Sequence, residues 1–234
     1  MPKELLKDII HNGIIVDIFN AEEAFGIEDI IGINATLIND ATYGQLFGAL
    51  QKFLVNSLIL TVAKLYDKPK NKYVIRSIPH ALDILENNAA KLDIMERPVL
   101  NRWFISRGYD KESIEKLNSK NITLKLVEYF RERMPSATEG AVGILDPAFY
   151  AVKTTRDKKI SHNEKVPSEA VFDPTYQQIL DLLTLAKEFV GAVGTPYLST
   201  VYEDDSGKYI MSSDSGRSSR CLIRVLKRLK VIQD

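Results

Sequence analysis

Apolar residues recur at intervals of three and four along much of this chain, which is the period of one face of an α-helix. The clearest run predicts a long helix that ends near Tyr66, because residues 67–72 combine a proline with several charges and suit a solvated turn. A shorter helix is expected after Pro79, with Leu82 and Leu85 inward. The inward face of the long helix is predicted to consist of Leu46, Leu50, Phe53, Leu54, Leu58, Val62 and Leu65.

The second half of the chain repeats the helical period. Residues 111–134 predict helix, with an interruption at residues 118–121 and an end at Pro135. Two Asp-Pro pairs, at residues 146–147 and 173–174, each predict a helix start, since aspartate caps a helix and proline suits its first position. Gly191 and Gly194 are expected to stop the second of these helices.

Both ends of the chain are less regular than its middle. Gly13, Gly26 and Gly32 interrupt any long period in the first 40 residues. Residues 200–211 predict a small hairpin at most, and a last helix is expected over about residues 216–231. The pattern therefore predicts an all-α fold with three parts, residues 1–40, 40–194 and 195–234.

Composition narrows the classes of function. The chain has 234 residues and is 45% apolar, which is enough for a sizeable core. Basic and acidic residues number 31 each, so any surface that binds a polyanion must be local. With one cysteine and three widely spaced histidines, the chain offers no disulfide framework and no thiolate zinc site.

Nothing in the sequence predicts export or a membrane span. The N-terminus is charged from its third residue, and the most apolar segment, residues 53–63, is shorter than the ~20 residues that cross a bilayer. We therefore expect a soluble, cytoplasmic protein. Phosphate-loop and dinucleotide-binding motifs are absent, which argues against a nucleotide-hydrolysing fold.

The last predicted helix carries a basic row opposite an apolar one. Its arginines either form a solvated face or follow the phosphates of RNA or DNA, and the acidic residues 203–205 just upstream are an alternative partner for them. The basic row comprises Arg217, Arg220, Arg224 and Arg228, and the apolar row comprises Leu222, Val225, Leu226 and Leu229.

The most suggestive chemistry lies in residues 156–162. An arginine holds its charge at any pH, whereas a histidine titrates near neutral pH, and acid–base cleavage of a phosphodiester needs both. Arg156 falls on the inward stripe that contains Val152 and Ile160, so it needs either a polar cleft or a structural ion pair. On a regular helix His162 would lie about 120° around and ~9 Å along from Arg156. The pair can converge only if the helix ends or distorts near Ser161.

This segment resembles the R-x(4–6)-H motif of HEPN-domain proteins, and Asp157 takes the polar position that often follows the arginine. An upstream stretch resembles the early helix of the abortive-infection, AbiU-like branch: it runs from Leu50-Gln51-Lys52 to Ala63-Lys64-Leu65-Tyr66-Asp67 and is followed by Arg76-Ser77-Ile78-Pro79. The resemblance covers roughly residues 40–190. Its one mild departure is Ser161, which stands where a small residue, often alanine, precedes the histidine.

The resemblance implies a HEPN-like helical bundle over residues 40–194, often a homodimer in which two copies of the motif face one another. Many such proteins are metal-independent endoribonucleases of phage defence or toxin–antitoxin systems, with an RNA substrate, no cofactor and in some cases an antitoxin protein. His162 would be the general acid and base, Arg156 would hold the phosphate, and Asp157 would orient either group. Other members bind RNA, nucleotide or a partner protein without catalysis, so a non-catalytic module is the alternative. A purely structural helical protein with an ion-paired Arg156 is a third.

Overall fold

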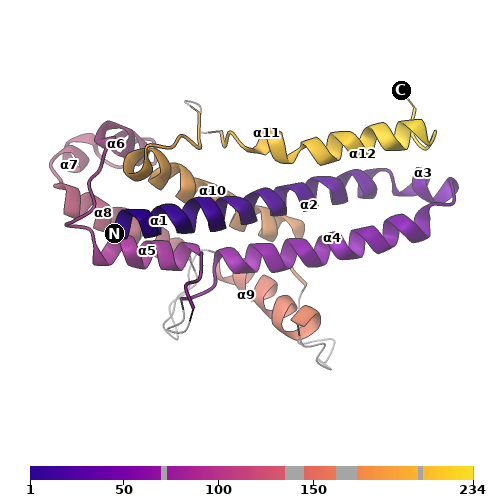
Figure 1. Cartoon of the computed structure of the whole chain (residues 1–234), viewed down its shortest axis with the longest axis horizontal. Coiled ribbons are helices and arrows are strands. Elements are labelled where there is room, and N and C mark those ends of the chain that lie inside the picture. Colours follow the sequence, from indigo (N-terminus) through magenta and orange to yellow (C-terminus); the bar gives the residue numbers. More distant parts are fainter. Residues whose placement is uncertain (70–72, 135–144, 162–172, 205–207, 234) are drawn as a thin grey trace.

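The structure is a computed structural model that describes residues 1–69, 73–134, 145–161, 173–204 and 208–233. Over these residues the chain forms helices, with an isolated antiparallel bridge between Glu203 and Tyr209, and no strand. The all-α prediction is therefore confirmed (Figure 1). The expected hairpin is reduced to that bridge, and residues 205–207, its predicted tip, lie outside the described residues.

The N-terminal third forms two long antiparallel arms. Helix α1 (Pro2–Ile9), a π-helical turn η1 (Ile10–Ile14) and α2 (Ile15–Ile33) follow one another without a gap. After α3 (Ala35–Asp40), α4 (Gly44–Leu65) returns along α2 (Figure 1). The predicted interruptions at the three N-terminal glycines are wrong, because η1 and α2 run through all of them. Gly13 and Gly26 instead leave room for the side chains of Arg76 and Ser219.

Four shorter helices gather at one end of the arms. They are α5 (Ile78–Asn87), α6 (Arg97–Ile105), α7 (Lys111–Glu115) and α8 (Ser119–Arg133). The predicted interruption between α7 and α8 is confirmed, since the Asn118 side chain caps α8 by accepting from the Asn121 amide at 2.8 Å. The helix predicted after Pro79 is also present, and Leu82 and Leu85 are buried in it.

The remaining helices are α9 (Asp146–Thr154), the π-helix η2 (Thr155–Ser161), α10 (Tyr176–Leu198), α11 (Ser212–Ser215) and α12 (Arg217–Arg228). Helix α10 begins two residues later than predicted, because Thr175 and Gln178 form a capping box there. It also runs through Gly191 and Gly194 and ends only at Ser199, whose φ of 53° is left-handed. The prediction that the two glycines stop it is wrong.

The core explains both the success and the failure of the prediction for α4. Leu58, Val62 and Leu65, in the second half of the helix, are buried in the main cluster as predicted. Leu46, Leu50 and Phe53, in the first half, are 59%, 41% and 69% exposed, so their predicted inward position is wrong. In this half Phe47 instead points inward, into a second, smaller cluster with Ile31, Ile38, Leu226 and Val231.

By length and composition alone α4 could also cross a membrane, because its apolar stretch extends beyond residues 53–63. One such helix is weak evidence, since core helices of soluble proteins pass the same test. The predicted boundaries near residues 40 and 194 remain predictions. The first 33 residues nevertheless pack along α4 and α10 and contribute to the main core.

Candidate functional site

The segment that carries Arg156 sits at the junction of α4, α9 and α10. Helix α9 opens with Asp146 and Pro147 in its first turn and buries Ala148, Ala151 and Val152 against its neighbours. At Thr155 the backbone changes to π-helical turns, which are rare and concentrate at functional sites. The predicted distortion before Ser161 is therefore present. His162, the next residue, lies outside the described residues.

Arg156 points inward, as the apolar stripe predicts. Its side chain is only 17% exposed and donates from Nη1 to Asp67 Oδ1 and from Nε to Asp157 Oδ1, both at 2.7 Å. Burial alone would lower the pKa of the guanidinium, but the hydrogen bonds to Asp157 and Asp67 outweigh it and raise that pKa. Arg156 is thus a permanent, oriented cation beside two carboxylates that are themselves 36% and 42% exposed.

Asp67 is held by a firm backbone. It follows the last turn of α4, and its carbonyl oxygen accepts a 2.7 Å hydrogen bond from the Ser77 hydroxyl, which also caps α5. The preceding Tyr66 is buried and donates to the Leu182 carbonyl of α10 at 2.5 Å, with its ring edge-on to Phe149 of α9. Four helices therefore fix the point from which the Asp67 carboxylate reaches Arg156.

A second ion pair ties η2 to the start of α10. Lys159 donates to both carboxylate oxygens of Asp173, at 2.7 and 2.8 Å, and the Thr155 hydroxyl lies 3.3 Å from the same carboxylate. The Asp-Pro pair predicts that Asp173 caps α10, and this is wrong: Thr175 is the cap, and the Asp173 carboxylate is engaged with η2. The ion pair therefore holds the end of η2 next to Asp173, just before α10.

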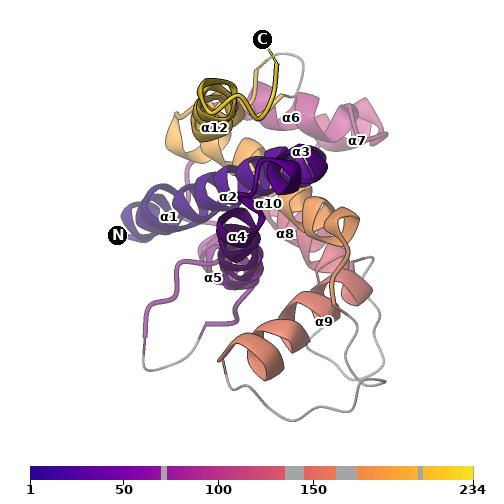
Figure 2. The same ribbon diagram turned by 90° about the vertical axis from the view of Figure 1, so that its right-hand side faces the viewer.

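The basic row of α12 lies elsewhere. Figure 2 shows α12 and α9 on opposite sides of the layer formed by α2 and α4. Helix α12 packs on α2 through its buried Leu226, and Val225 and Leu229 of the predicted apolar row are each 43% exposed. Two members of the basic row are engaged locally, Arg217 with Asp214 at 2.6 Å and Arg220 with the Ser213 carbonyl at 2.9 Å.

All four predicted arginines, Arg217, Arg220, Arg224 and Arg228, are exposed. Because α12 and α9 lie on opposite sides of the α2–α4 layer, these arginines do not meet Arg156 within one chain. Of the alternative partner proposed for the row, the acidic stretch 203–205, Glu203 packs its carboxylate against Gly191 of α10 instead, and Asp204 accepts from the Lys208 amide at 3.0 Å. Residue 205 lies outside the described residues.

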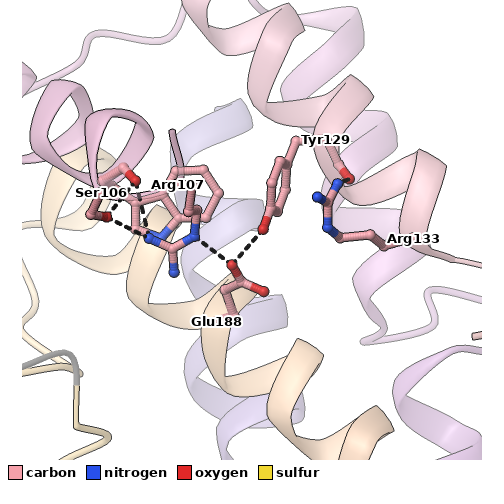
Figure 3. A network of polar contacts seen from close by, with 6 residues as sticks. Ser106, Arg107, Tyr129, Arg133 and Glu188 are labelled. Atoms are coloured by element: carbon pink, nitrogen blue, oxygen red, sulfur yellow. Dashed lines mark hydrogen bonds and ion pairs between the residues drawn. The ribbon is translucent and has the colours of Figure 1, made fainter. Parts of the chain in front are cut away.

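A further polar cluster, which the sequence pattern did not reveal, joins α6, α8 and α10 (Figure 3). Glu188 accepts from Arg107 Nε at 2.5 Å and from the Tyr129 hydroxyl at 2.7 Å. The Arg107 guanidinium lies 3.8 Å from the centre of the Trp103 ring, and the Arg133 guanidinium lies 3.5 Å from that of Tyr129. Every charge in this cluster has an internal partner, so we assign it to the packing of the three helices.

Comparison with known proteins identifies the family. A family model described as AbiU2, of the HEPN type, matches residues 34–214. The chain belongs to this HEPN AbiU2 family. The match runs from the turn before α3 to α11 and includes both Asp67 and Arg156, but not α12. Searches of curated proteins and of solved structures give no significant match.

Proposed function

We propose that this HEPN AbiU2 protein is a metal-independent endoribonuclease that acts in the cytoplasm, in phage defence or as the toxin of a toxin–antitoxin pair. The observation that carries the proposal is the state of Arg156. Arg156, only 17% exposed, lies on a distorted helix, is oriented by two half-exposed carboxylates and stands six residues before the histidine of the R-x(4–6)-H motif. A guanidinium that is held in one orientation beside partly exposed carboxylates suits the stabilisation of a phosphorane-like transition state.

In this proposal His162 removes the proton from a ribose 2′-hydroxyl, which attacks the adjacent phosphorus. The bond to the 5′-oxygen breaks, a protonated histidine returns a proton to that leaving oxygen, and a 2′,3′-cyclic phosphate end remains. Arg156 binds a non-bridging oxygen and offsets the negative charge that develops there. Asp157 orients Arg156 through its 2.7 Å bond to Nε.

A homodimer is part of the proposal. Leu46, Leu50 and Phe53 form an exposed apolar row on the first half of α4, and the second half of the same helix packs against α9 and η2. Lys52 is the one charged residue in α4 before Lys64, so a second copy would meet little charge along this row. An apolar row at this position is suited to a self-complementary, two-fold contact.

The proposed partners are an RNA substrate and, in a toxin–antitoxin setting, an antitoxin protein. The exposed arginines of α12, with a local excess of positive charge, suit contacts to the phosphates of a bound strand. Because this helix lies away from Arg156 in its own chain, we assign it to strand binding outside the cleavage site.

The second candidate is a non-catalytic HEPN module that binds RNA, nucleotide or a partner protein. One observation favours it: two carboxylates already neutralise Arg156, as they would in a structural ion pair.

Cleavage of a labelled RNA in the presence of a chelator separates the two candidates. Wild-type protein should cut the RNA, and His162→Ala should lower the rate by about 10²–10⁴-fold, which is the usual contribution of a general acid–base group. Arg156→Lys should also lose most of the activity, because lysine keeps the charge but not the planar group that donates from Nε and Nη1 to two carboxylates. His11→Ala is the matched control, since His11 packs against Tyr202 instead. Equal cleavage by wild type and His162→Ala would rule out the proposed enzyme.

A further inference from the structure

The hydrogen bonds of Arg156 use two edges of its guanidinium group. Nε is engaged by Asp157, which is the next residue in the chain, and Nη1 is engaged by Asp67, which is 89 residues away. Among the described residues Nη2 has no hydrogen-bond partner, although it carries two of the five N–H donors. The two carboxylates therefore fix the plane of the group and leave one nitrogen available for a ligand.

We propose that Asp67 is a positioning residue for the reaction of this site: it holds the Arg156 guanidinium so that Nη2 faces the scissile phosphate. The inference rests on the proposed ribonuclease function and adds to the motif a residue that lies outside it. Asp67 touches neither the substrate nor the reacting atoms and acts through Arg156.

The anchoring of the two carboxylates distinguishes their roles. Asp157 is attached to the same turn of η2 as Arg156 and moves with it, so it cannot fix the guanidinium relative to the rest of the molecule. Asp67 belongs to a different element, and its backbone is held through the Ser77 hydroxyl and the neighbouring Tyr66. Among the hydrogen bonds of Arg156 to described residues, the one to Asp67 fixes the guanidinium relative to the α4–α10 core.

The charges explain why the contact must be specific. Arg156 and the two carboxylates together carry a net charge of −1, so their field alone does not attract a phosphate. Binding then depends on direct N–H···O bonds from Nη2, which require the correct orientation. A misplacement of about 1 Å in such a group can cost on the order of 10²-fold in rate.

The test is single-turnover RNA cleavage by Asp67→Ala and Asp67→Asn at saturating and limiting protein. Asp67→Ala should lower the maximal rate by about 10–100-fold with a small change in the half-saturating concentration, because orientation and not affinity is lost. Asp67→Asn keeps an oxygen that can accept from Nη1, so it should recover part of the rate. Asp83→Ala is the control: Asp83 pairs with Arg131 at 2.8 Å and its side chain is 37% exposed, against 2.7 Å and 36% for Asp67.

The outcomes separate this inference from the proposed function. If wild type cleaves and His162→Ala does not, the enzyme is established whatever Asp67 does. In that case an Asp67→Ala rate equal to wild type, or higher, overturns the positioning role, and a higher rate would mean that Asp67 competes with RNA for Arg156. A lower rate supports the positioning role if the melting temperature of the slower variant, Asp67→Ala or Asp67→Asn, lies within a few degrees of that of Asp83→Ala.

Discussion

At the scale of single residues, Glu203 is a carboxylic acid whose surroundings favour its neutral form. Its carboxyl group packs against Gly191 on α10, and the structure gives it no hydrogen bond from a described side chain. Burial raises the pKa of Glu203 to about 7, Arg107 opposes this, and Glu188 and Asp204 add to it. The residue therefore changes charge near neutral pH inside a packed contact.

Glu203 should make the stability of the protein depend on pH. Because the folded-state pKa lies above the usual 4.5, the folded state binds the proton more tightly, and stability is lost as the pH rises from about 4.5 to about 7. In wild type we expect the free energy of unfolding to fall by about 1–3 kcal/mol over this range because of Glu203. Glu203→Gln should remove this fall and be more stable than wild type at pH 8. Urea unfolding at pH 5 and pH 8 measures both effects.

The matched control is Glu112→Gln, which changes a carboxylate that is 80% exposed on α7. It should leave the pH dependence unchanged. Parallel curves for wild type and Glu203→Gln would show that Glu203 is ionised throughout this range in the folded protein.

At the scale of helices, two glycines of α10 are sites of close contact. A Cβ atom added at Gly194 would lie 2.3 Å from a ring carbon of Tyr202 and 2.8 Å from the Thr200 carbonyl oxygen. Gly191 admits the Glu203 carboxyl group in the same way. The segment that follows α10 can fold back onto this helix because Gly191 and Gly194 have no side chains at the points of contact.

Gly194→Ala should therefore destabilise the protein although alanine favours helix. The clash involves backbone and an aromatic ring, neither of which can yield cheaply, and overpacking of this kind costs about 1–3 kcal/mol. Gly48→Ala is the opposite case, since nothing lies within 4 Å of the new Cβ in α4, and it should stabilise by about 0.5–1 kcal/mol. Urea unfolding of both variants in dilute solution tests the pair, and a stabilised Gly194→Ala would contradict the packing.

The same features explain what could be predicted from the sequence. Period and caps predicted the helices, the break before Asn121 and the inward position of Arg156, because these depend on neighbours within a few turns. Glycines that receive a side chain from a distant segment look identical to glycines that end a helix. The exposed face of α4 looks identical to a core face, since periodicity reveals that a stripe is apolar but not what covers it. Asp67 was visible only as part of a family-like stretch, because its pairing with Arg156 is tertiary.

At the scale of the whole molecule, the exposed row on α4 should govern the state of association. If a second copy covers this row, Phe53→Asp places a charge in an apolar contact and should convert dimer to monomer at micromolar concentration. Light scattering coupled to size-exclusion chromatography measures the mass directly.

Val201→Asp is the control for this experiment, because Val201 is 59% exposed on a different segment and should leave the mass unchanged. A wild-type protein that is monomeric at all accessible concentrations would exclude the dimer. Loss of the dimer in both variants would exclude the α4 row as its contact.

The placement of α12 on the side of the molecule opposite η2 limits how an RNA strand can lie on it. A strand that touches Arg156 and the arginines of α12 must either pass around the α2–α4 layer of one chain or run from one chain to the arginines of another. In both cases the length of RNA protected from chemical modification must exceed the few nucleotides around the cut, with the extra protection on one side of it. Removing the basic row should shorten this footprint and leave the position of the cut unchanged.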